Sequence, residues 1–267
     1  MASLDFIENS SKGYAFIWHN RAYIFQNAIP VVFIKVLCIL TIYVFGVAGN
    51  PLREGIFLLS SHALEAFFII RLIRFYLYHE PIHIWGKIIP VPQNIVMETK
   101  KQAPFLDRKI AIQAGVAIYL LTKIGLGFLI GIMAINVPNE YQAISEPSLE
   151  KALLSLVMLT GILWSLRLLW LFVPAGMGFR PTDFLRKING IVNSLYFIGV
   201  LIICSIPLLL LYSFGINILE SLFGQASAIN IILSSILQAF FVITTLCLQS
   251  VAICHGVYDL MAHRGKS

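Results

Sequence analysis

Charged residues are scarce in this sequence. Of its 267 residues, 12% are charged, whereas 58% are hydrophobic and the mean hydropathy is +0.85. Because about a quarter of the residues in an ordinary soluble chain are charged, this composition excludes a soluble globular protein. Polar stretches are also short, and the longest interval between apolar runs covers residues 79–109. That interval is too short for an independent domain, so we expect no separate nucleotide-driven or large catalytic module here.

The patterns of other membrane and secreted classes are missing too. No run of about ten residues alternates between apolar and polar side chains, as a transmembrane barrel strand does. The N-terminus lacks the short apolar region and small-residue cleavage site of a signal peptide, so we expect the first apolar run to direct insertion. All the cysteines lie within apolar runs and are expected to be small, reduced hydrophobic residues: Cys38, Cys204, Cys247 and Cys254.

Six apolar runs are long enough to cross a bilayer. A hydrocarbon core of about 30 Å needs about 20 residues of helix, and an open strand edge would leave backbone groups unsatisfied in lipid. The sequence therefore predicts an all-α polytopic membrane protein with six transmembrane helices, at 28–48, 55–78, 110–135, 152–175, 191–216 and 229–258. Similarity between 64–70 and 237–243 would fit three successive helical hairpins.

The chain divides into three parts on this interpretation. Residues 1–27 form a cytoplasmic or interfacial amphipathic segment, residues 28–262 the six-helix membrane domain, and residues 263–267 a short cytoplasmic tail. The aromatic stretch 13–25 fits a helix that lies in the membrane interface. A simple upstream extension of the first span is the alternative.

Lysine and arginine gather on one side of the predicted spans. The positive-inside rule places that side, and with it both termini, in the cytoplasm. The formal charge of +6 is then mainly a topology signal and an attraction to anionic inner-leaflet lipid, and we expect no nucleic-acid partner. The basic side holds Lys12, Arg21, Lys87, Lys100, Lys101, Arg108, Lys109, Arg180, Arg186, Lys187, Arg264 and Lys266, while Arg53 and Lys151 lie on the other side.

The end of the fourth span and the loop after it resemble a known pattern. Arg167-Leu168-Leu169-Trp170 through Pro174-Ala175, then the basic loop 180–187 and Asn189-Gly190, resembles bacterial six-helix membrane proteins of the YciC-like type. That group is similar to the membrane domain sometimes fused to glycerophosphoryl diester phosphodiesterases. The resemblance implies a bacterial inner (plasma) membrane and six helices, but it carries over no functional residue. No stretch here corresponds to the phosphodiesterase domain, so lipid-ester hydrolysis is not implied.

Two opposite charges fall near the middle of the membrane. An ionised group there is expensive and usually faces a partner or a wet cavity. Counting about 1.5 Å per residue from the span ends brings Glu65 of the second span and Lys123 of the third to similar depths. We predict an intramembrane ion pair that holds the two helices together. The functional alternative is a carboxylate coupled to a proton or a substrate.

Three further cations lie close to the inner boundary on different predicted helices. Lys35, Arg71 and Arg167 fall within about 12 Å of that boundary by the same counting. Taken singly, such side chains usually extend to the headgroups. If they face inward together, they form a basic pocket for a phosphate, a lipid headgroup or another anion.

The sequence His79-Glu80-Pro81-Ile82-His83 matches the zinc-protease pattern H-E-x-x-H. Proline at the third position stops or kinks the helix that must present both histidines. A third ligand would have to come from Asp183, His255, Asp259 or His263. We therefore predict a turn that ends the second span, with no metal or cofactor, and keep the metalloprotease as a remote alternative.

The sequence favours a non-enzymatic integral inner-membrane protein that binds or organises lipid or a partner membrane complex. Its expected partners are anionic inner-leaflet lipids and a second membrane protein. The alternative is a small transporter or channel for an anionic or lipid-like solute, which would use Glu65, Lys123 and the basic pocket.

Overall fold

A computed structural model describes residues 5–82, 107–136, 166–188, 191–224 and 227–263. All regular elements in these ranges are helical, which confirms the predicted all-α class. The α-helices are α1 (Phe6–His19), α2 (Arg21–Val44), α3 (Pro51–Tyr78), α4 (Arg108–Asn136), α6 (Phe172–Met177), α7 (Pro181–Lys187), α8 (Ile191–Phe223) and α9 (Ala228–His263), and a 3-10 helix, η1, covers Leu166–Trp170.

Five of these helices are long and apolar enough to cross a membrane. They are α2, α3, α4, α8 and α9, and they correspond to five of the six predicted spans. The fourth predicted span, 152–175, begins outside the described residues. Its described end consists of η1 and α6, which share the short apolar stretch Leu168–Met177.

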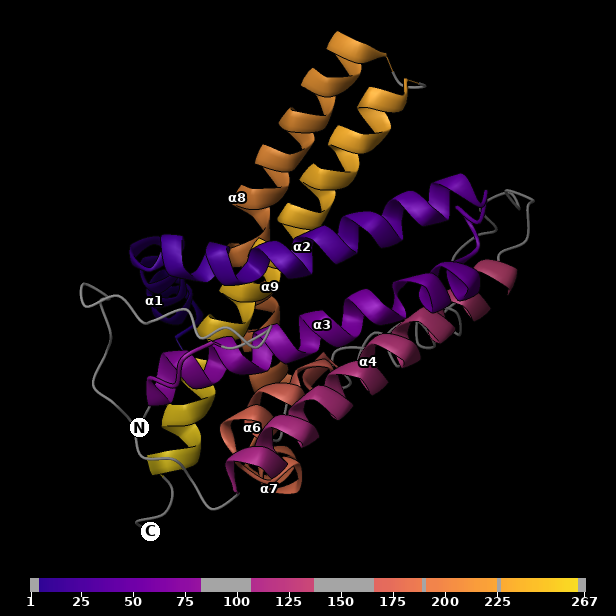
Figure 1. Ribbon diagram of the computed structural model, residues 1–267. Helices are drawn as coiled ribbons and strands as arrows, with labels where there is room; N and C mark the ends of the chain where they lie inside the picture. Colours follow the sequence, from indigo (N-terminus) through magenta and orange to yellow (C-terminus); the bar gives the residue numbers. More distant parts are fainter. Residues whose placement is uncertain (1–4, 83–106, 137–165, 189–190, 225–226, 264–267) are drawn as a thin grey trace, which may run out of the picture.

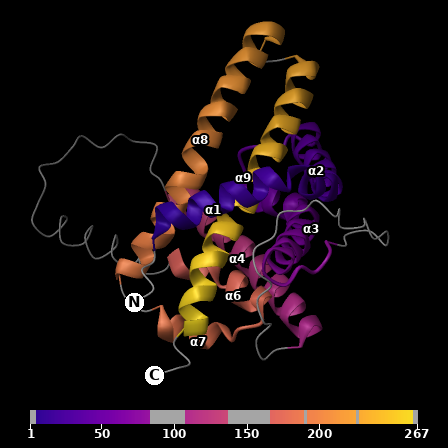
Figure 2. The same ribbon diagram turned by 90° about the vertical axis from the view of Figure 1, so that its left-hand side faces the viewer.

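The long helices form two groups that meet at one end. Helices α2, α3 and α4 lie side by side, whereas α8 and α9 form an antiparallel hairpin whose tip projects from the rest (Figures 1 and 2). The groups meet where α3 ends and α4 begins, and α6 and α7 lie there too (Figure 1). We call this region the shared end. From it the two groups diverge, so the core is concentrated at the shared end.

Helix α3 is the centre of this core. Every residue from Phe68 to Tyr78 is buried except Arg71, which is partly buried. Helices α2, α4, α6 and α9 all pack against α3, which explains why almost every side chain of this segment is buried. By contrast, Leu210, Leu211 and Phe214 near the tip of α8 are exposed, as expected for side chains that face lipid.

The N-terminal aromatic stretch is divided between two helices. Helix α1 begins at the Asp5 cap, whose carboxylate accepts hydrogen bonds from Ile7 N (2.9 Å) and Glu8 N (3.1 Å). It ends at His19, and α2 starts immediately after Asn20. The chain from Arg21 onward thus extends the first span upstream, while Phe6–His19 is a separate helix packed on α8 and α9.

Helix α1 also provides a hydrogen-bond donor for backbone carbonyl groups of α8. Proline has no N–H, so Pro207 leaves the carbonyl four residues earlier, that of Ile203, without its helical donor. The Tyr14 hydroxyl reaches from α1 to Ile203 O (3.3 Å) and Cys204 O (3.1 Å). Helix α8 therefore continues through the proline with a neighbouring helix supplying the missing donor.

A glycine allows α1, α8 and α9 to approach closely. At Gly256 of α9, a Cβ atom would lie 2.6 Å from Asn9 Nδ2 of α1 and closer still to the Tyr196 hydroxyl of α8. Asn9 Nδ2 donates to that hydroxyl at 3.0 Å. The absence of a side chain at Gly256 thus makes room for a buried hydrogen bond between two other helices.

We expect Gly256→Ala to destabilise the fold by about 1–3 kcal/mol, because an added methyl in a packed site forces its neighbours apart. Gly125→Ala is the matched control, since a Cβ there meets nothing within 4 Å and alanine favours the helix. Thermal unfolding in detergent measures both variants. Equal midpoints for the two would contradict the packing described at Gly256.

Candidate functional site

The side chain of Glu65 lies fully buried near the middle of α3, about 20 Å from either end of the helix. Four side chains reach its carboxylate. Oε1 receives the Lys35 ammonium of α2 and the Ser61 hydroxyl (3.1 Å). Oε2 contacts the His62 ring through Nδ1 (3.1 Å) and the Tyr119 hydroxyl of α4 (3.1 Å). We call this group the Glu65 centre.

The ion partner of Glu65 is Lys35, whereas the sequence predicted Lys123. The Lys123 ammonium instead lies over the Tyr119 ring, 5.5 Å from its centroid, one side chain away from the carboxylate. Counting residues from the span ends placed Lys123 at the level of Glu65, but this count cannot show in which direction the Lys123 side chain points. The pair therefore joins α3 to α2, and Tyr119 provides the link to α4.

The Glu65 centre holds three helices together and keeps a carboxylate in apolar surroundings. A buried ion pair is tolerated only when further hydrogen bonds satisfy the remaining lone pairs, and the two oxygens here receive two partners each. The side chain of His62 is 17% exposed, so it is the partner through which the centre approaches the helix surface. Chemically, the arrangement can fix the helices or hold a proton.

A second charged group lies at the shared end, where α3 ends. Arg74 binds Glu80 through two parallel contacts, Nη2 to Oε1 (2.6 Å) and Nε to Oε2 (2.9 Å), and its Nη1 donates to Gly176 O (3.1 Å). Arg108 at the start of α4 contacts the same Glu80 Oε2 at 2.9 Å. Two arginines thus share one carboxylate and join α3, α4 and α6.

These contacts determine the ionisation of Glu80. Burial alone would raise the pKa of Glu80, but the hydrogen bonds and positive charges of Arg74 and Arg108 lower it by more. The pKa consequently lies below the ordinary value of a glutamate, and the carboxylate is ionised at neutral pH.

Arg71 lies one turn before Arg74 and lacks comparable partners. Its guanidinium covers the Phe67 ring, with 5.0 Å between Cζ and the centroid. Nε and Nη1 of Arg71 are buried, and no hydrogen-bond acceptor reaches them within the described part of the chain. Arg108, Glu80 and Arg74 are the charged groups that act on it electrostatically. We call these four residues the arginine cluster.

The residues of the predicted basic pocket belong to different polar groups. Lys35 is part of the Glu65 centre and Arg71 is part of the arginine cluster. Arg167 lies in η1, but its side chain is outside the described residues. The sequence interpretation missed Arg108 as a neighbour of Arg71. The signal that could have identified Arg108 is its position at the start of the span that follows α3.

The H-E-x-x-H match does not form a helical zinc site. Helix α3 ends at Tyr78, and His79 adopts a left-handed conformation with φ of 57°, so the helix that should present both histidines stops before the first one. Glu80 is bound to two arginines and cannot serve as a free base. His83 lies outside the described residues. In the described ranges, no three His, Cys, Asp or Glu side chains group as metal ligands.

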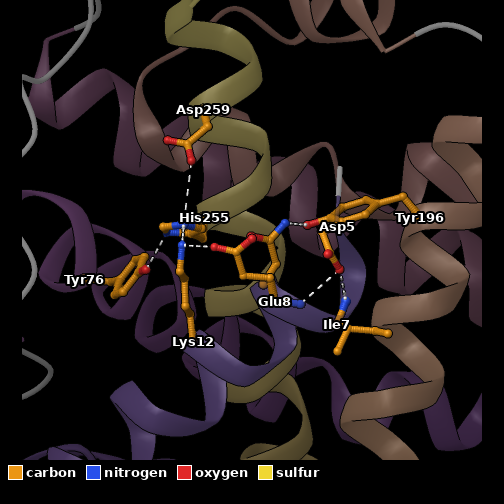
Figure 3. Close-up of polar contacts among 9 residues, drawn as sticks. Asp5, Ile7, Glu8, Lys12, Tyr76, Tyr196, His255 and Asp259 are labelled. Carbon is orange, nitrogen blue, oxygen red and sulfur yellow. Dashed lines mark hydrogen bonds and ion pairs between the residues drawn. The ribbon is translucent and has the colours of Figure 1, made fainter. Parts of the chain in front are cut away.

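A third polar group joins α1 to α9 and α3 (Figure 3). Lys12 contacts Nε2 of His255 at 2.9 Å, and Nδ1 of His255 lies 2.8 Å from the Tyr76 hydroxyl. Because an ammonium has only donors, Nε2 accepts and the ring hydrogen lies on Nδ1. Glu8 holds Lys12 at 2.8 Å, and Asp259 lies 3.6 Å from His255 Nε2. His255 is thus a packing residue with hydrogen bonds on both ring nitrogens.

We expect Lys35→Met to destabilise the protein by about 3–5 kcal/mol, because it leaves Glu65 buried without its cation. Combining it with Glu65→Leu should restore most of the loss. Lys123→Met is the control and should have a much smaller effect. Thermal unfolding in detergent measures all three, and a larger loss for Lys123→Met than for Lys35→Met would contradict the assigned pair.

The lowered pKa of Glu80 predicts a stability difference that depends on pH. Its contribution is complete above the unfolded-state pKa of about 4.3 and is lost as the pH falls through the lower folded-state pKa. Glu80→Gln should therefore unfold more easily than wild type at pH 7, by about 1–2 kcal/mol. The difference should shrink as the pH falls below the unfolded-state pKa and disappear below the folded-state pKa. Unfolding midpoints of wild type and Glu80→Gln, measured from neutral to acidic pH, test this prediction. A difference between the two proteins that does not change with pH would refute it.

Comparison with known proteins yields no relative: no family model, curated protein or solved structure matches this chain.

Proposed function

We propose that this chain is a non-enzymatic, multi-pass protein of a bacterial inner membrane that binds anionic inner-leaflet lipid. In the proposed topology both termini are cytoplasmic and the chain crosses six times, as three hairpins. The five long apolar helices support an integral membrane protein. The sixth crossing rests on the sequence of residues 152–175.

The observation that supports this proposal best is the placement of charge along the helices. The start of α2, the end of α3 and the starts of α4 and α8 lie at the shared end (Figure 1). Basic side chains concentrate there, which agrees with a cytoplasmic shared end and with attraction to anionic lipid. In the described ranges they are Lys12, Arg21, Arg71, Arg74, Arg108, Lys109, Arg180, Arg186 and Lys187, whereas Arg53 lies at the opposite ends of the helices.

Helix α1 adds a surface that suits the headgroup region. Ile7 and Trp18 are 62% and 66% exposed, while the opposite face of α1 packs on α8 and α9. The Arg21 guanidinium lies 4.7 Å from the Trp18 ring centroid. An exposed indole beside a cation is typical of membrane interfaces, and it supports a helix held at the inner surface of the bilayer.

The Glu65 centre supports a second candidate, a small transporter for an anionic or lipid-like solute. An ionisable group at mid-membrane marks solute or proton pathways in many membrane proteins, and Lys123 lies one ring away from Glu65. This function would require a Glu65→Gln variant that folds normally and loses flux in vesicles. Loss of folding in that variant favours the structural role instead.

Native mass spectrometry of the gently extracted protein tests the proposal. We expect anionic phospholipid to remain bound in preference to zwitterionic phospholipid, because the shared end carries the positive charge. A co-purified membrane protein would support the organising role. Stoichiometric zinc would contradict the non-enzymatic proposal, and bound lipid without selectivity for charge would contradict the anionic-lipid proposal.

A further inference from the structure

We infer that the arginine cluster is a binding site for one phosphate-type oxyanion, held chiefly by Arg71 and Arg108. This inference rests on the proposed lipid binding and names the residues that would carry it. The ligand chemistry is a tetrahedral phosphate group, either in a phospholipid headgroup or as free phosphate.

The first argument is the missing acceptor at Arg71. Nε and Nη1 of this guanidinium are both buried and unmatched within the described ranges. A buried charged donor without an acceptor is strongly unfavourable. The Phe67 ring covers one face of the guanidinium but supplies no acceptor for its edge. An oxyanion beside the guanidinium would give one of these N–H groups an acceptor in a charge-assisted hydrogen bond.

The second argument is the local charge. Among the described residues, the positive charges of Arg74 and Arg108 and the negative charge of Glu80 act on Arg71. Both oxygens of Glu80 are already occupied: Arg74 contacts each of them, and Arg108 contacts Oε2. Arg74 is further committed to Gly176 O. The cluster therefore retains two positive charges beyond what Glu80 neutralises, and Arg71 has donors that remain to be satisfied.

The position of the cluster favours a ligand from the membrane interface. Arg71 lies about 10 Å before the end of α3 at Tyr78, and the Arg108 side chain is 50% exposed. A snorkelling arginine would extend its whole guanidinium into water, whereas two nitrogens of Arg71 are enclosed. The site thus combines two enclosed donors on Arg71 with an accessible cation, Arg108, near the end of α3 that the proposal places at the inner surface of the membrane.

The test compares Arg71→Gln with Arg186→Gln. Both remove one positive charge near the shared end, but Arg186 is exposed on α7 and takes no part in the cluster. Delipidated protein in detergent is titrated with phosphatidylglycerol, phosphatidylcholine or inorganic phosphate, and bound molecules are counted by native mass spectrometry. Thermal shifts are recorded in parallel.

For wild type and Arg186→Gln we expect one phosphatidylglycerol bound more tightly than the rest. Arg71→Gln should weaken that binding about 10- to 100-fold, the value of one hydrogen-bonded charge pair. Arg71→Lys should fall between the two, because it keeps the charge but lacks the planar fork. Without ligand, Arg71→Gln should unfold at or above the wild-type temperature, since it removes a buried cation that lacks an acceptor. Arg71→Lys provides a second measurement if glutamine impairs folding.

The outcomes separate the site from the wider proposal. If phosphatidylglycerol binds wild type, Arg71→Gln and Arg186→Gln equally, the site is refuted while anionic-lipid binding stands. If inorganic phosphate binds in an Arg71-dependent way and phosphatidylglycerol does not, the site stands and the lipid function is refuted. If neither ligand binds to wild type, both are refuted.

Discussion

A polar side chain on a helix that is enclosed on all sides must find its partner on a neighbouring helix. The second half of helix α3 is in this position, since nearly every residue from Phe68 to Tyr78 is buried, and the polar groups of α3 accordingly contact the helices that pack against it. Glu65 binds Lys35 of α2 and Tyr119 of α4. Arg74 reaches the backbone of α6, and Tyr76 contacts His255 of α9. In low-dielectric surroundings these contacts are far more specific than apolar packing, so the order of helices around α3 follows from them.

Arg71 departs from this rule. Two of its nitrogens are buried without an acceptor in the described part of the chain. A buried polar group without a partner calls for an explanation, and the phosphate site proposed above supplies one. On that proposal, α3 both organises the fold and supports a binding site.

The sequence predicted the helix class and five long apolar helices, because hydropathy depends only on position along the chain. It did not predict which cation would face Glu65, because a change of one residue turns a helical side chain by about 100°, and depth contains no such information. The sequence also did not predict the arginine cluster, for a related reason. Glu80 looked like part of a metal motif, while the left-handed turn at His79 directs it back to Arg74.

The hydrogen bonds from Tyr14 to α8 connect residues that are 189 and 190 positions apart in the chain. Helix α1 is synthesised first, yet the carbonyl groups it serves do not exist until most of the protein has left the ribosome. During synthesis α1 therefore forms before its partner on α8, and the exposed side chains of Ile7 and Trp18 on α1 would suit a membrane surface in the meantime. The carbonyl group that Pro207 leaves without a helical donor finds its partner only when α1 packs on α8, which makes this contact a late step of assembly.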